Sequence, residues 1–372
     1  MVRKALEGLR VVDLSTLFAV PQVAAILADF GADVVKVEPP AGDPLLSLGA
    51  RRNGVSAPYA LANRGKRLVH LDPDRHRAPL HALLATADVI VSNQPLALLR
   101  RWQADPDAVL ARNPRAVIVT VSAFGCDGPW AGRPGGGSLA EAFGGLTYLT
   151  GESDGPPMLP SLPLGDSLTG LAGVIGVLAA CWGRDVRGAP GQHVDVAMYE
   201  PIITLLGSLV PAWTPGEPSP ARHGSRLLDG APRNVYECGD GTFVVLSAPT
   251  DAQVARLLPL LGVTEDDPRF AAAGPRLANA DELDRLVGAW IGQRPAADAL
   301  AAFDAARLPC GPVHDLTRLF AHPQVQARAS LRPVDGLLMP GPIARMSRTP
   351  AEPGPAPTGP VPVAAVLADW QG

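Results

Sequence analysis

The sequence is poor in cysteine, and its few cysteines form no recognisable framework. Four of its 372 residues are cysteine, at positions 126, 181, 238 and 310, with neither a CxxC pair nor the spacing of a disulfide scaffold. This usage is typical of a reducing compartment, so we expect a cytoplasmic protein. The seven histidines are isolated and make no HxH or HExxH pattern, so we expect no metal site.

Charge and long apolar runs are also scarce. Charged residues make up 18% of the chain and its net charge is −4, which provides no basic surface for nucleic acid. No apolar run reaches the length of a membrane span, and the first residues lack the apolar segment of a signal peptide. We therefore expect no membrane partner. With 47% hydrophobic residues, a chain of this length can form two domains with a large core.

The first forty residues have the pattern of a strand–helix–strand unit. Residues 9–14 and 33–38 are apolar and rich in valine, which predicts buried strands. Residues 21–30 predict a helix that begins at Pro21 and ends before Gly31, so the two strands should be parallel. The turn after the first strand lacks GxGxxG, and we therefore expect no NAD.

The pattern continues through the first half of the chain and then changes. Strands at 68–71, 88–93 and 116–122 alternate with helical segments, which predicts a doubly wound α/β domain. The basic cluster at 63–67 is either a solvated surface or a site that binds phosphates. After a proline-rich segment, the sequence predicts a hairpin at 235–246 and helices over 251–307, and hence a smaller α+β domain.

One carboxylate stands directly before the longest helix-like run. The segment 162–170 (Leu-Pro-Leu-Gly-Asp-Ser-Leu-Thr-Gly) places Asp166 ahead of the apolar residues 171–182. Asp166 or Ser167 suits the N-cap position of such a helix. Two interpretations follow: Asp166 only caps the helix, or the helix N-terminus holds an ionised carboxylate in place as a nucleophile.

Several short motifs lie in the same order as in one enzyme family. They are the segments 6–14, 31–39, 63–67, 165–170, 191–195 and 310–313. With them the chain resembles the family III CoA-transferases, which include formyl-CoA transferase, carnitine CoA-transferase and α-methylacyl-CoA racemase. The resemblance implies a Rossmann-like large domain, a small α+β domain and an interlocked-ring homodimer. The large domain would comprise 1–200 and 313–372, the small one 222–290, and the linkers 201–221 and 291–312.

The resemblance also implies a chemistry and a set of site residues. The family's catalytic aspartate falls on Asp166, which would carry the acyl group as an aspartyl anhydride and the coenzyme as an aspartyl-CoA thioester. The ligands implied are coenzyme A, as part of an acyl-CoA donor, and a carboxylic acid acceptor. Backbone N–H groups that stabilise the oxyanions would come from Gly135, Gly136, Gly137, Gly144 and Gly145. Coenzyme contacts carried over by position are Leu17, Phe18, Ala19, Lys66, Asn93 and Arg101, of which Lys66 and Arg101 suit phosphates.

This chain departs from the family pattern at two places that matter for catalysis. Racemase members use a His-Asp pair in the 133–137 region, where this chain has Gly136 and Gly137, and their assisting glutamate falls on Thr250. Proton exchange at a Cα needs two positioned acid/base groups, so we favour acyl transfer over racemisation. Transferase members commonly carry an acid at position 137 as well, so a catalytically degenerate acyl-CoA-binding protein is a third interpretation. The acyl donor, the acceptor and the role of Cys126 stay open.

Overall fold

The computed structural model describes residues 4–371; residues 1–3 and 372, which the predicted large domain includes, lie outside the described residues. The chain forms two compact units. Unit 1 comprises the chain up to Leu146, the segment Leu159–Trp213 and the chain from Pro323 onward. Unit 2 comprises Thr147–Met158 and Thr214–His322.

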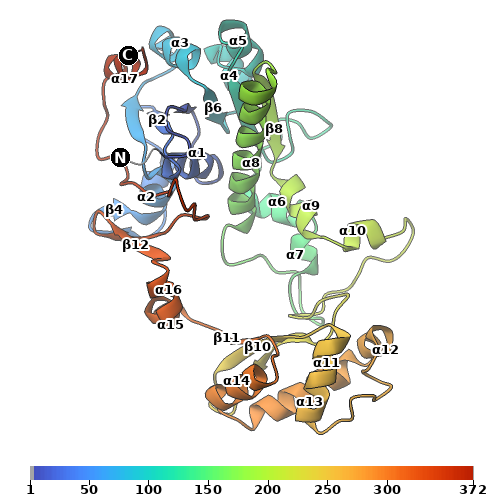
Figure 1. Ribbon diagram of the computed structural model, residues 1–372. Helices are drawn as coiled ribbons and strands as arrows, with labels where there is room; N and C mark the ends of the chain where they lie inside the picture. Colours follow the sequence, from blue (N-terminus) through green and yellow to red (C-terminus); the bar gives the residue numbers. More distant parts are fainter. Residues whose placement is uncertain (1–3, 372) are drawn as a thin grey trace. The chain divides into compact units, whose positions relative to one another are not determined.

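Unit 1 is built on a six-stranded parallel sheet in the order β5-β2-β1-β6-β7-β8. Figure 1 labels β2, β6 and β8 of this sheet. Its strands are β1 (Arg10–Asp13), β2 (Asp33–Glu38), β5 (Arg67–His70), β6 (Val89–Ser92), β7 (Val117–Ser122) and β8 (Gln192–Ala197). The predicted α/β fold with a parallel sheet is confirmed. The order of the strands reverses direction between β1 and β6, and ligands of such sheets bind outside the strand carboxyl ends at this point.

Helices cover both faces of the sheet, which explains why its strands are apolar throughout. Neighbouring residues of a strand, such as Val11 and Val12, belong to different cores. One core contains α1 (Ala19–Asp29) and α8 (Leu164–Arg187), and the other contains α3 (Arg77–Thr86) and α17 (Val363–Gln371).

The remaining elements of unit 1 are short. The helices are α2 (Ala57–Asn63), α4 (Leu96–Trp102), α5 (Pro106–Arg112), α6 (Gly137–Phe143), α9 (Tyr199–Leu205), α10 (Leu209–Ala212), α16 (Pro323–Ala327) and the 3₁₀ turn η1 (Pro44–Ser47). Two hairpins pair β3 (Arg51–Arg52) with β4 (Val55–Ser56) and β12 (Leu331–Val334) with β13 (Leu337–Pro340). The four-residue helix α7 (Leu146–Leu149) spans the first boundary between the units.

The long helix α8 begins earlier than the sequence predicts. Its N-cap is Pro163, so Asp166 is the third helical residue and makes no capping hydrogen bond. The prediction that Asp166 or Ser167 caps the helix is therefore wrong. The sequence-based prediction placed the start of the helix next to the apolar run at 171–182. The helix in fact also includes Leu164 and Gly165.

Glycines on α8 bring it unusually close to α1. A Cβ on Gly173 would lie 2.7 Å from Val23 Cγ2, and one on Gly170 would lie 3.2 Å from Ala19 O. Among the described helices, α8 alone is long and apolar enough to cross a membrane by length and composition. Because its inner face packs against α1 and the sheet, it is a core helix of unit 1.

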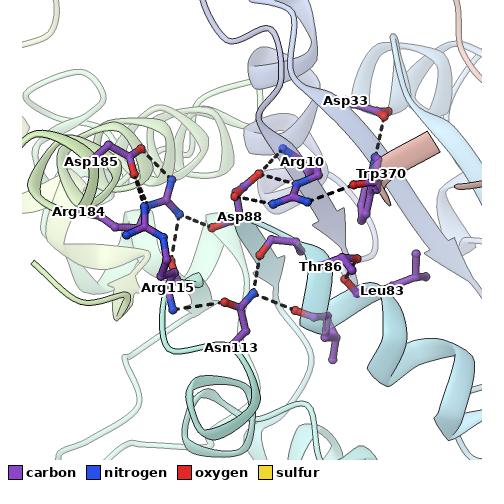
Figure 2. A network of polar contacts seen from close by, with 12 residues as sticks. Arg10, Asp33, Leu83, Thr86, Asp88, Asn113, Arg115, Arg184, Asp185 and Trp370 are labelled. Carbon is purple, nitrogen blue, oxygen red and sulfur yellow. Dashed lines mark hydrogen bonds and ion pairs between the residues drawn. The ribbon is translucent and has the colours of Figure 1, made fainter. Parts of the chain in front are cut away.

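A polar network ties the elements of unit 1 together at the amino ends of the strands (Figure 2). Arg10, at the start of β1, donates to Asp88 from Nε at 2.9 Å and from Nη2 at 3.1 Å. Its Nη1 donates to the carbonyl oxygen of Trp370 in α17 at 3.4 Å. Arg184, near the end of α8, donates to the carbonyl oxygens of Asp88 and Arg115, both at 3.0 Å. These contacts fix the amino ends of the strands in place relative to α8 and α17.

Unit 2 contains a three-stranded antiparallel sheet in the order β11-β10-β9. The predicted hairpin is confirmed as β9 (Arg233–Glu237) and β10 (Phe243–Ser247), and β11 is Cys310–Pro312. The helices are α11 (Asp251–Leu257), η2 (Leu258–Leu261), α12 (Ala273–Ala278), α13 (Ala280–Gly292), α14 (Ala296–Ala305) and α15 (Leu316–Ala321).

Two segments that we expected to be linkers contain regular structure. Residues 291–312 carry α14 and β11, and Ala299 and Phe303 of α14 are buried in the core of unit 2. Residues 201–221 include most of α9 and all of α10. The segment 291–312 differs from the expectation because its apolar residues complete the core of unit 2.

Candidate active site

A cavity of about 610 Å³ lies at the carboxyl ends of β1, β6 and β7. Its walls come from the turn after β1, the start of α4, the end of β7, the glycine-rich segment before α6 and the first turn of α8. Most of these groups are apolar side chains, amides or backbone. Among the described residues that line it, only Arg133 and Asp166 carry a charge.

The turn after β1 is held in an uncommon conformation. Leu17 has a φ of 65°, in the left-handed region that costs energy for a residue with a side chain. Asn93, which follows β6, holds Thr16, the residue before Leu17, by two hydrogen bonds. Asn93 Oδ1 accepts from Thr16 N at 2.9 Å, and Asn93 Nδ2 donates to Thr16 O at 2.8 Å. Asp43 Oδ1 accepts from Leu17 N at 3.2 Å. These contacts fix one wall of the cavity.

A buried group of charges lies behind this turn. Lys36 donates to Asp43 at 3.0 Å and to the carbonyl oxygen of Ser15 at 2.6 Å. Lys66 donates to Asp13 at 2.8 Å. Although burial opposes ionisation, Lys36 and Lys66 hold the pKa of Asp13 below its usual range. The network supports the turn after β1 from inside the protein.

Lys66 itself does not reach the cavity. Its ammonium group donates to three protein acceptors, Asp13 Oδ2, Pro21 O and Asn63 Oδ1, at 2.8, 2.8 and 2.9 Å. Its side chain has no exposed surface. Burial lowers the pKa of Lys66 to about 8, against the opposing effect of Asp13. All three donors of the ammonium group are used inside the protein, which leaves none for a phosphate in this conformation.

Asp166 lies against the backbone of the first turn of α6. A Cβ on Gly137 would overlap the Asp166 carboxylate, and a Cβ on Gly165 would lie 2.8 Å from Gly137 O. The starts of α6 and α8 therefore meet with glycine on both sides. In this arrangement a side chain at position 137 would take the place of the Asp166 carboxylate, which explains physically why glycine is found there.

A second carboxylate, Glu141, stands one helical turn further along α6. It is 1% exposed, and its Oε1 accepts from Gly165 N at 2.7 Å. Burial, followed by the like charge of Glu141, raises the pKa of the Asp166 carboxyl. Within residues 4–371, no donor hydrogen-bonds the Asp166 carboxylate and no cation pairs with it. Asp166 is thus half-buried, unpaired and more basic than an ordinary aspartate.

Cys126 also lines the cavity, and its neighbours hold it in place. Thr120 Oγ1 lies 3.3 Å from Cys126 Sγ and 2.6 Å from His193 Nε2. Asp195 accepts from Cys126 N at 2.7 Å. Burial raises the pKa of the Cys126 thiol and lowers that of His193. The histidine is therefore a neutral partner for Thr120, and it does not itself line the cavity.

The structure brings together some of the residues predicted from sequence. Leu17, Phe18, Ala19, Asn93, Gly135, Gly136 and Asp166 all line the cavity, and Gly137 contacts Asp166 from behind it. Four other residues lie elsewhere. Lys66 is buried behind the turn, and Arg101 is an exposed residue of α4 that bonds Asp74 at 2.7 Å. Gly144 and Gly145 pack at the far end of α6 against Ile202 and Leu206.

Two charged residues near the cavity were not singled out by the sequence. Arg133 is the cation closest in sequence to the Gly135–Gly137 turn, and Glu141 is the single charged residue of the helix Gly137–Phe143. A lone charge in an otherwise apolar or glycine-rich segment is the signal that could have drawn attention to both. In residues 4–371, no group of three or more His, Cys, Asp or Glu side chains is placed to hold a metal ion.

A parallel sheet with a cavity at its switch point is the architecture of α/β enzymes that bind substrate or coenzyme outside the strand ends. The model of CoA-transferase family III matches residues 6–360, and the chain therefore belongs to this family.

Relatives of known activity and structure agree with this assignment. The chain is 34% identical to the beta subunit of succinyl-CoA–L-malate CoA-transferase from Chloroflexus aurantiacus, over 93% of this chain and 88% of that protein. It is 31% identical to succinate–glutarate CoA-transferase from Agrobacterium fabrum, over 93% and 90% of the two chains. It also resembles the crystal structure of a CAIB/BAIF family protein from Brucella suis, with a TM-score of 0.83 and 31% identity over 99% and 100% of the chains.

Proposed function

We propose that the protein transfers coenzyme A between carboxylic acids through covalent intermediates on Asp166. The observation that carries this proposal is the unpaired, half-buried Asp166 carboxylate in a cavity at the switch point of the sheet. A nucleophile needs a free lone pair and access to substrate, and Asp166 has both. The raised pKa also makes its carboxylate a better nucleophile once it is ionised.

In the proposed reaction, an Asp166 oxygen attacks the thioester carbonyl of the acyl-CoA donor. The C–S bond breaks, CoA leaves as a thiolate, and an aspartyl–acyl anhydride remains. The thiolate then attacks the aspartyl carbonyl, which releases the donor's acid and leaves an aspartyl-CoA thioester. The acceptor carboxylate repeats these two steps in reverse and departs as the new acyl-CoA. The backbone at Gly136 and Gly137, beside Asp166, is the proposed source of oxyanion stabilisation.

Racemisation has little support in the same cavity. Taking a proton from one face of a Cα and returning it on the other needs two acid/base groups. Among the described lining residues, Asp166 is the one carboxylate and Arg133 the one cation. The guanidinium of Arg133 does not release a proton in a protein, and burial keeps Cys126 as a thiol.

A trapping experiment tests the proposal directly. The protein and its Asp166→Asn variant are each mixed with a panel of acyl-CoAs in D₂O, quenched with hydroxylamine and analysed by peptide mass spectrometry. We expect a hydroxamate on the Asp166 peptide of the unmodified protein and none in the variant. If deuterium enters a 2-methylacyl-CoA and no adduct forms on Asp166, the protein is a racemase and the proposal of CoA transfer is wrong. Tight acyl-CoA binding with neither signal would indicate a binding protein.

We further propose that the chain acts as a homodimer in the cytoplasm. The outer face of α8 carries a stripe of exposed apolar residues at helical spacing: Leu171, Ile175, Leu178, Trp182 and Val186. Their exposed fractions run from 36% to 68%, and the stripe extends over about 22 Å of helix. An apolar surface of this kind on a protein marks an interaction site, and a second copy would cover it symmetrically.

A further inference from the structure

Leu17 combines two features that are unusual for a leucine. Its φ of 65° lies in the left-handed region, which glycine adopts freely and which costs energy for a residue with a side chain. Its side chain is 43% exposed and belongs to none of the hydrophobic cores of the described residues. Neither the backbone conformation nor the packing of a core therefore explains a leucine at this position.

The location of this strain in the molecule points to a ligand. Six non-glycine residues within residues 4–371 have a positive φ, and of these Leu17 alone lines the cavity. Strained backbone gathers at functional sites, and it persists only where the surrounding structure enforces it. The strain at Leu17 therefore places an apolar side chain on the wall of the cavity, and the contacts of the turn must offset its cost.

Asp43 makes the contact that bears directly on this conformation. Its Oδ1 accepts from Leu17 N at 3.2 Å and from Leu45 N at 2.9 Å, and its Oδ2 accepts from Lys36 at 3.0 Å. A carboxylate is a strong acceptor for backbone N–H groups. The Asp43 side chain has no exposed surface, and Asp43 does not line the cavity. It can therefore act on a ligand only through the turn that it holds.

The residues on either side of Leu17 are fixed independently. Thr16 is held by Asn93 at both its N–H and its carbonyl group. The Phe18 side chain packs against the small core that contains Leu45. The conformation of Leu17 between them then depends on the hydrogen bond to its own N–H group.

We propose that Asp43 is a positioning residue for the coenzyme: it holds Leu17 in the left-handed conformation, so that the leucine side chain contacts the pantetheine arm of a bound acyl-CoA. This inference rests on one part of the proposed function, the binding of an acyl-CoA in the cavity. Asp43 itself touches no substrate. Because the pantetheine arm does not react, loss of this contact should raise KM and the Kd of the coenzyme and leave kcat nearly unchanged.

The test is a double-mutant cycle between Asp43 and Leu17, with the Kd of coenzyme A measured by titration calorimetry. We expect Asp43→Ala and Leu17→Gly each to weaken binding about tenfold, the order of one lost charge-assisted hydrogen bond or one lost apolar contact. Independent effects would multiply to about 100-fold in the double variant. We expect the double variant to stay near the single ones, because without the leucine side chain Asp43 has nothing to position.

Leu17→Gly also tests the strain without any change at Asp43. Glycine adopts a positive φ without strain, so we expect this variant to have a higher Tm than the unmodified protein while it binds coenzyme A more weakly. Removal of a side chain that serves only packing would instead lower Tm. This measurement does not depend on the folding of Asp43→Ala.

Two further variants separate positioning from general support of the fold. Asp43→Asn keeps an acceptor for Leu17 N but loses the charge beside buried Lys36, so it should lower Tm and change the Kd of coenzyme A less than about threefold. Asp105→Ala removes another aspartate that accepts a backbone N–H group, at the start of α5 and away from the cavity. It should lower Tm and leave the Kd as it is.

The outcomes are distinct. A double variant weakened about 100-fold would show that Asp43 acts independently of Leu17, and Asp43→Ala with a lowered Tm but a normal Kd would show that Asp43 only supports the fold. Either result would overturn the inference, as would a normal Kd in Leu17→Gly or no binding of coenzyme A to the unmodified protein. If the unmodified protein binds coenzyme A but forms no Asp166 adduct with any donor, the proposed transfer fails and the role of Asp43 in coenzyme binding does not.

Discussion

Asp166 and Glu141 are two carboxylates that meet where α6 and α8 begin, and they have different surroundings. Glu141 is buried and bonded to Gly165 N, whereas Asp166 faces the cavity without a partner. We regard Glu141 as a positioning residue. It fixes the first turn of α8 through the Gly165 N–H group, and its charge raises the pKa of Asp166 after the larger effect of burial.

Replacing Glu141 by glutamine should shift the pH dependence of transfer. Glutamine keeps an oxygen that can accept from Gly165 N but carries no charge, so the pKa of Asp166 should fall while the contribution of burial remains. The reaction needs ionised Asp166, so the acidic limb of kcat/KM should move to lower pH. Steady-state rates between pH 4 and 8 would measure it. A shift of equal size in the exposed-site control Glu265→Gln, or none in Glu141→Gln, would contradict the assignment.

Replacing Asp166 by asparagine should make the protein more stable at neutral pH. The folded-state pKa of Asp166 is raised above its unfolded value, so its stabilising contribution is complete below the unfolded pKa and is lost as pH rises through the folded pKa. Asparagine does not titrate. The difference in Tm between Asp166→Asn and the unmodified protein should therefore be positive at pH 7 to 8 and shrink as pH falls towards 4. A difference in Tm that stays the same across this pH range would contradict the raised pKa of Asp166.

The residues of the site were predictable to different degrees. The resemblance assigned catalysis to Asp166 and coenzyme contacts to Asn93 and the turn after β1, and these residues line one cavity. Their roles stay predictions. The burial of Lys66 was not predictable, because its acceptors on Asp13 and Pro21 come from distant parts of the chain that a local basic cluster does not reveal. Its contact with a phosphate stays a prediction. Arg133 was overlooked, since its position over the Trp130 ring depends on how the loop folds.

At the scale of elements, α8 links the core to the cavity. Its glycines let α1 approach closely, and the first residues of α1 line the cavity together with Asp166. The strands of the sheet were predictable from their valine-rich runs, because a strand buried on both faces needs apolar residues throughout. The start of α8 was not predictable from the sequence, because Leu164 and Gly165 carry no distinctive helix signal.

Replacing either of two glycines of α8 by alanine should change the stability of the protein, in opposite directions at the two positions. At Gly183 no atom lies within 4 Å of an added Cβ, so Gly183→Ala should stabilise the protein by up to about 1 kcal/mol through helix propensity. At Gly173 the Cβ would meet Val23 at 2.7 Å, so Gly173→Ala should destabilise it by about 1–3 kcal/mol. Displacement of α1 should also lower activity in the second variant. Chemical denaturation measures both, and changes of the same sign would refute the close-packing argument.

At the scale of the whole molecule, the two units alternate along the chain. The boundary between Trp213 and Thr214 falls inside the proline-rich segment that composition marked out. The return of the chain to unit 1 at Pro323, and the contribution of Thr147–Met158 to unit 2, follow from tertiary packing that hydrophobic periodicity does not encode. The family resemblance supplied the idea that both chain ends build one domain.

The apolar stripe on α8 leads to the last prediction, which concerns assembly. Ile175 and Trp182 are 68% and 64% exposed, and a water-facing stripe of this length should be covered in a stable protein. We expect the unmodified protein to have twice the 38.6 kDa mass of one chain in light scattering after gel filtration. The double variant Ile175→Glu/Trp182→Glu would force two charges into the contact, and desolvating them costs several kcal/mol.

In the interlocked homodimer that the family resemblance implies, the subunits could not separate without opening one chain, so we expect the damage to appear during folding. We expect the double variant to be recovered as single chains or aggregates with a lowered Tm. Leu338→Glu makes the same kind of change at an exposed position of β13, 53% exposed, and should leave mass and Tm unchanged. A single-chain mass for the unmodified protein would refute the homodimer. A double variant with normal mass and Tm would show that α8 lies outside the interface.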